Sequence, residues 1–79
     1  MTEVSIDRFL ARELVETNLV IIKSEIDSIL KVWEQKSAQK MIERTRRGEL
    51  PEAEMDAIAL TNLLDKRNEL ERLMSKIGG

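Results

Sequence analysis

The stretch "NLVIIKSEI", Asn18–Ile26, holds four consecutive apolar residues, Leu19 to Ile22, inside a highly charged chain. Each residue of a helix is rotated by ~100° from the one before it, so four in a row point in four directions. A helix with a single buried side should not carry such a run. The stretch therefore indicates a helix that is covered on more than one side.

The apolar residues around this stretch fall on two helical stripes that lie ~120° apart. From Val15 onward the first stripe has alternating spacings of four and three, which is typical of knobs-into-holes packing. Its members are Val4, Ala11, Val15, Leu19, Ile22, Ile26, Ile29 and Trp33. The second stripe consists of Ile6, Leu10, Leu14, Ile21 and Val32, with Phe9 and Val20 to one side. One helical neighbour covers one stripe but not both.

Helix-forming residues dominate the chain, and no Gly or Pro interrupts it between Glu3 and Arg47. The segment "RTRRGELPEAE" then offers Gly48 as a left-handed helix end and Pro51 as the first turn of a new helix. We predict an all-α helical hairpin in one domain, residues 1–79. Its first helix spans about 3–47, its turn about 48–50 and its second helix about 51–77. A break near Thr17–Asn18, giving a three-helix bundle, is the alternative.

Counting outward from the predicted turn sets the register of the hairpin. It pairs Leu30 with Leu70 and places Trp33 beside Lys66 and Arg67. The second helix then ends opposite Ile22, so the residues before about Val20 have no cover within the chain. Burying their side chains is worth several kcal/mol at ~25 cal/mol per Å2. We therefore expect a homodimer in which two hairpins form a four-helix bundle or coiled-coil assembly.

Basic residues follow the first stripe toward the turn at spacings of four, four and three: Lys36, Lys40, Arg44 and Arg47. One interpretation is a surface that tracks phosphates. The other is an ion-pair partner for the acidic residues predicted to lie opposite, Glu49, Glu52 and Asp56. Arg46 points elsewhere on the helix.

The residue composition limits the kinds of metal and catalytic site that the chain can form. The chain has 79 residues, a net charge of -2, no Cys and no His, so thiolate or imidazole metal sites and the commonest general base are missing. No apolar run is long enough to cross a bilayer, and no signal-peptide pattern opens the chain. We expect a cytoplasmic protein that is not an enzyme, without cofactor or metal and without a membrane partner.

The segment "GELPEAEMDAIALTNLL", residues 48–64, resembles the last helix of the helical chorismate mutases, and "SEIDSIL", residues 24–30, resembles part of their first helix. The first of these segments covers about a fifth of the chain, and the chain leaves no room for the middle helix of that family. The resemblance implies an intertwined helical dimer with a site built from Arg, Lys and Gln. We keep this enzyme as a remote alternative.

The leading hypothesis is a non-catalytic oligomerisation or adaptor module, or a small regulatory subunit, that binds other helices. Its predicted interaction residues are Ile6, Phe9, Leu10, Leu14, Val15, Leu19, Ile21, Ile22 and Trp33. The alternative is a small nucleic-acid-associated regulator. That alternative uses Lys36, Lys40, Arg44, Arg46 and Arg47.

Overall fold

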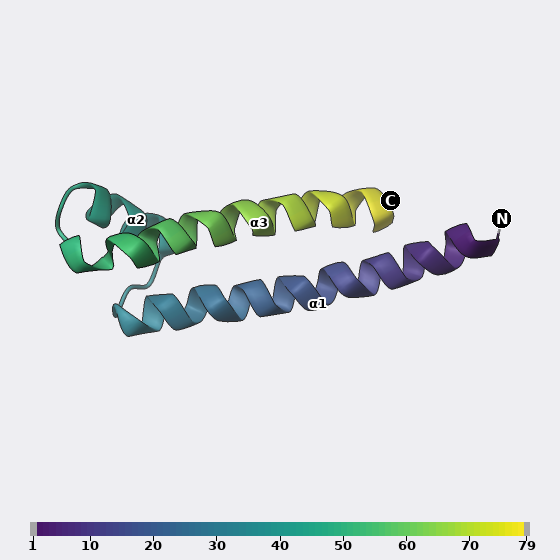
Figure 1. Cartoon of the computed structure of the whole chain (residues 1–79), viewed down its shortest axis with the longest axis horizontal. Coiled ribbons are helices and arrows are strands. Elements are labelled where there is room, and N and C mark those ends of the chain that lie inside the picture. Colours follow the sequence, from purple (N-terminus) through teal and green to yellow (C-terminus); the bar gives the residue numbers. More distant parts are fainter. Residues whose placement is uncertain (1, 79) are drawn as a thin grey trace.

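The computed structural model describes the backbone of residues 2–78 and the side chains of residues 7–77, and in this range it contains helices and no strand. Three α-helices follow one another: α1 (Thr2–Val32), α2 (Ala38–Arg46) and α3 (Glu54–Gly78), the last preceded by the 3-10 turn η1 (Pro51–Ala53). α1 and α3 lie side by side and run in opposite directions, and α2 packs where α1 ends and α3 begins (Figure 1). The all-α prediction is confirmed.

The predicted continuous helix over residues 3–47 is wrong, because α1 ends at Val32. Glu34 adopts a left-handed conformation, with φ of 53°. The Glu34 amide donates to the Lys31 carbonyl (3.2 Å) and the Gln35 amide donates to the Leu30 carbonyl (2.8 Å). This pair of bonds is the Schellman motif that ends many helices, with glutamate at the position where glycine is usual. The alternative break near Thr17–Asn18 is also wrong, since α1 runs through both residues.

Packing of α2 offsets the strain at Glu34. A left-handed residue other than glycine costs about 1–2 kcal/mol. The break lets α2 fold back, with Ser37 as its N-cap, and it buries Met41 completely. Full burial of a methionine side chain is worth about 1.5–3 kcal/mol, and the Gln35 side chain adds a hydrogen bond to the Trp33 carbonyl (3.0 Å). Burial of Met41 is thus large enough to outweigh the strain.

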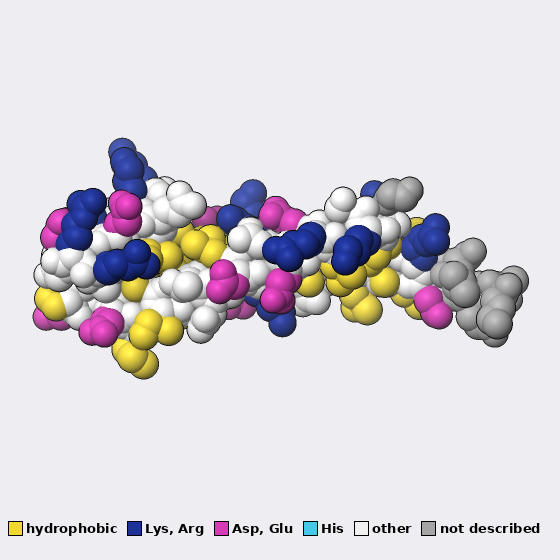
Figure 2. All heavy atoms as spheres, turned by 90° about the horizontal axis from the view of Figure 1, so that it is seen from above, with side chains coloured by type: hydrophobic (Ala, Val, Ile, Leu, Met, Phe, Trp, Pro, Cys, Tyr) yellow, Lys and Arg dark blue, Asp and Glu magenta, His cyan; other side chains and the backbone are white. Residues whose placement is uncertain are grey.

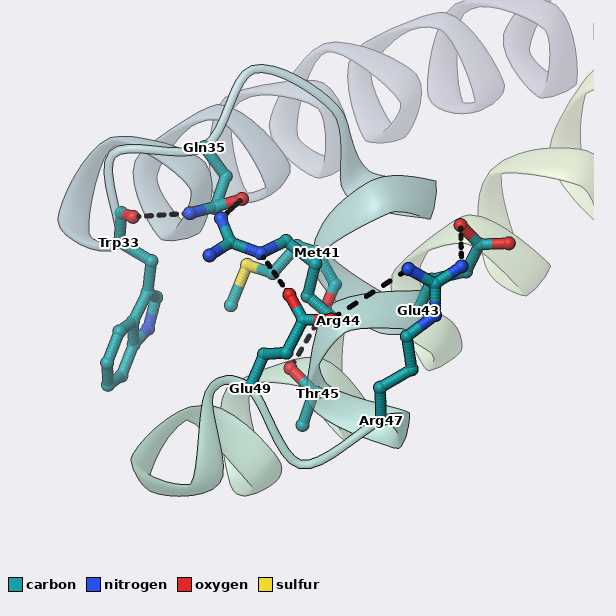
Figure 3. Close-up of polar contacts among 8 residues, drawn as sticks. All are labelled: Trp33, Gln35, Met41, Glu43, Arg44, Thr45, Arg47 and Glu49. Atoms are coloured by element: carbon teal, nitrogen blue, oxygen red, sulfur yellow. Dashed lines mark hydrogen bonds and ion pairs between the residues drawn. The ribbon is translucent and has the colours of Figure 1, made fainter.

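The second helix end uses the same motif with glycine. Gly48 has φ of 81°. The Gly48 amide donates to the Thr45 carbonyl (3.0 Å), and the Glu49 amide donates to the Arg44 carbonyl (2.9 Å). Arg44 also joins the two helix ends, because its guanidinium donates to Gln35 Oε1 (3.2 Å) and to Glu49 Oε1 (3.1 Å) (Figure 3). Pro51 then opens η1, which leads into α3.

The core joins all the helices. Its buried residues are Ile22 and Ile26 of α1, Met41 of α2, Ala53 of η1 and Leu60 of α3. At the edge of this core, Trp33 Nε1 donates to Asp56 Oδ2 (2.7 Å).

The contact between Trp33 and Asp56 overturns the predicted register, which placed Trp33 beside Lys66 and Arg67. α3 is displaced by about ten residues, roughly 15 Å, toward the N-terminus of α1. The displacement follows from the break, because α2 no longer extends the line of α1. Val15, which the hairpin register left uncovered, is therefore buried, with 5% exposed. Only the first turns of α1 extend beyond the end of α3 (Figure 1).

Glycine substitution tests the break at Glu34. Glu34→Gly should leave the protein as stable as the parent or stabilise it by up to about 1 kcal/mol, because glycine adopts the left-handed conformation without strain. The control Lys23→Gly, at an exposed site inside α1, should lose about 0.5–1 kcal/mol. Urea unfolding followed by circular dichroism measures both. A loss for Glu34→Gly as large as the control's would mean that the helix continues through residue 34.

The register predicts a specific effect on the only tryptophan. Asp56→Ala should shift the fluorescence of Trp33 and lower the unfolding free energy by about 1–2 kcal/mol, because it removes a charged acceptor from a half-buried donor. Arg67→Ala should leave the emission unchanged. The opposite pattern of shifts would support the hairpin register instead.

Candidate protein-interaction surface

The first apolar stripe of α1 faces α3. Val15, Ile22 and Ile26 are buried, while Ala11, Leu19, Ile29 and Trp33 are half-buried. Four residues of the predicted interaction set, Val15, Leu19, Ile22 and Trp33, therefore contribute to the chain's own packing. The sequence grouped them correctly on one face but could not tell which neighbour covers that face.

The described members of the second stripe remain uncovered by the chain. Leu10 is 50% exposed, Leu14 65% and Ile21 48%. Phe9 and Val32 are also exposed. Ile6, which the sequence places on the same stripe, lies outside the residues whose side chains are described. The described part of the predicted second stripe is thus a real surface of this chain.

A groove of about 620 Å3 lies beside this stripe, between α1 and α3. The apolar side chains that line it include Ile22, Ile29 and Leu63. Glu25 of α1 and Lys66 of α3 line it as well. Across the described residues no salt bridge joins these two side chains within 4.0 Å. The groove therefore has largely apolar walls, with Glu25 on α1 and Lys66 on α3.

Helical spacing extends the two walls of the groove toward the chain termini. Leu14 precedes Ile21 by seven residues, and Leu73 follows Lys66 by seven, so each lies two turns away on the same side of its helix. Both leucines are exposed. Figure 2 shows hydrophobic side chains at the surface between charged ones, including a group over the half nearer the N-terminus. We call the following residues the open face: Leu10, Leu14, Asn18, Ile21 and Glu25 of α1, with Ala59, Asn62, Lys66 and Leu73 of α3.

The sequence predicted only three of the nine residues of the open face. It identified the leucines and Ile21 of α1 from their periodicity, but missed Glu25, Asn62 and Lys66. These three look like ordinary solvated residues until the register of α1 against α3 is known. The seven-residue spacing of Lys66 and Leu73 places both on one side of α3. The sequence does not show that this side lies next to the second stripe of α1.

Acidic neighbours neutralise part of the predicted basic surface. Arg44 pairs with Glu49 (3.1 Å), and Arg47 lies 3.8 Å from Glu49 and 3.9 Å from Glu43 (Figure 3). The predicted partner Asp56 bonds to Trp33 instead. Lys36, Lys40 and Arg46 make no salt bridge within the described part of the chain.

Among the described residues, no three His, Cys, Asp or Glu side chains are placed to hold a metal ion. Arg67 is half-buried on α3, and its Nε atom has no hydrogen-bond partner there.

No helix in residues 2–78 is both long enough and apolar enough to cross a membrane.

No protein-family model, curated protein or solved structure matches the chain significantly.

Proposed function

We propose that this protein is a non-catalytic assembly module that acts by helix–helix association through its open face. The observation that carries the proposal is the second apolar stripe of α1, whose described members are about half exposed or more. An apolar stripe of this kind beside a groove is the surface that helical partners recognise, through side chains at spacings of three, four and seven residues. The two-helix surface accepts one or two further helices and would then form a bundle.

The total exposed surface supports the proposal. The chain exposes 6245 Å2. A folded monomer of 9.1 kDa is expected to expose about 4,900 Å2. The excess is larger than the roughly 800 Å2 that a standard interface removes from each partner. Association through one face would therefore bring this small chain closer to the burial that is normal for its mass.

The energetics point the same way. Each leucine or isoleucine of the open face that becomes fully covered contributes roughly 1 kcal/mol, because about half of its surface is already buried. Four such side chains contribute a few kcal/mol per chain. Small domains are stable by about 5–15 kcal/mol in total, so covering the open face is a large part of what this chain can gain.

Adjacent residues of α1 provide a matched test. Ile21 lies on the open face, while Val20 is 68% exposed on another side of the helix. If chains associate through the open face, the melting temperature of the parent protein rises with its concentration. Ile21→Glu should abolish this dependence and Val20→Glu should keep it, because only the first places a charge in the contact.

Circular dichroism at low concentration checks that both variants keep the helix content of the parent. Equal behaviour of the two variants, or a parent melting temperature that does not change with concentration, would contradict the proposal.

A further inference from the structure

We infer that the occupant of the open face is a second copy of this chain, seated so that Glu25 of each copy meets Lys66 of the other. The inference rests on the proposed association through the open face and adds the partner and its geometry. It follows from the position of one acid and one base on the two helices that form the groove.

The register places the acid and the base at the same level. Antiparallel helices pair residues whose numbers have a constant sum, and the bond between Trp33 and Asp56 fixes that sum. Glu25 is therefore level with residue 64 of α3, about 3 Å along the axis from Lys66. By the same count, Leu14 of α1 lies within about two residues of the level of Leu73.

These levels select one arrangement of two copies. When two identical chains meet face to face about a two-fold axis parallel to α1, the α1 helix of each copy lies on the α3 helix of the other. Residues at the same level then face each other across the interface. Leu14 of one copy meets Leu73 of the other, and Glu25 meets Lys66, twice by symmetry. A two-fold axis perpendicular to the helices would place α1 on α1 and would bring neither pair together.

Charge and size both fit a second copy. The open face carries one acid and one base among those named, so it is complementary to itself and needs no partner of opposite net charge. Such pairs fix orientation and specificity more than affinity. The molecule measures 55 × 18 × 17 Å. Its long face leaves room for the roughly 800 Å2 per partner of a standard interface.

Charge reversal in separate chains tests this geometry. Glu25→Lys should weaken self-association at least about tenfold, because it places two lysines at each contact, and Lys66→Glu should do the same with two carboxylates. An equimolar mixture of the two variants should associate as tightly as the parent, since each contact then pairs a lysine of one chain with a glutamate of the other. Sedimentation equilibrium of each variant and of the mixture measures the dissociation constants.

Asp27→Lys is the control, because it makes the same charge change on the same helix two residues away. It should self-associate like the parent. Mixing it with Lys66→Glu should restore only one of the two pairs, so this mixture should associate more weakly than the mixture of Glu25→Lys with Lys66→Glu. Glu and Lys have similar helix propensities and both sites are exposed, so the variants should fold.

The remaining outcomes separate this inference from the proposed function. If the single variants associate like the parent, the pairs do not form and the inference is overturned. The inference is also overturned if the double variant, with both reversals in one chain, associates like the parent while the mixture of single variants does not. The pair of Glu25 and Lys66 would then lie within one chain. In both cases association through the open face stands. A parent chain that does not associate at all would overturn the proposed function itself.

Discussion

One constraint governs this structure: α1 carries two apolar stripes, and residues 2–78 contain a single other long helix, α3, with which to cover them. α3 lies on the first stripe and forms the core with it. The second stripe then has no neighbour within the described chain, and the groove beside it remains open. With no Cys for disulfides and no His, a chain of 79 residues has few other means of stabilisation, and association is the one that its surface provides.

The break after α1 decides how the first stripe is covered. A continuous helix would have kept residues 38–46 in line with α1 and would have left α3 opposite only the second half of that helix. The left-handed Glu34 turns α2 back over the core, where Met41 is buried. α3 then slides toward the N-terminus of α1 and reaches Val15. The same slide brings Glu25 and Lys66 to one groove, so the geometry of the open face depends on a strained residue far from it.

The sequence specifies the features that depend on local chemistry. The two stripes follow from the helical period, and the turn after Arg47 follows from Gly48 and Pro51, each of which has a conformational reason to lie there. The break at Glu34 could not be predicted, because its backbone is the one that favours glycine and the sequence offers a glutamate. What stabilises it is the burial of Met41 against residues far away in the chain. The register and the α3 wall of the groove depend on that break, so they were missed together with it.

Sedimentation equilibrium of the unmodified chain is the most direct measurement of whether a second chain covers the second stripe. If a second copy covers the stripe, the measured mass rises with concentration from 9.1 kDa toward twice that value across the micromolar range. A well-folded protein whose mass stays at 9.1 kDa up to the highest micromolar concentrations would contradict this prediction. The uncovered stripe of α1 would then be a tolerated exposed surface and not an interface between two copies.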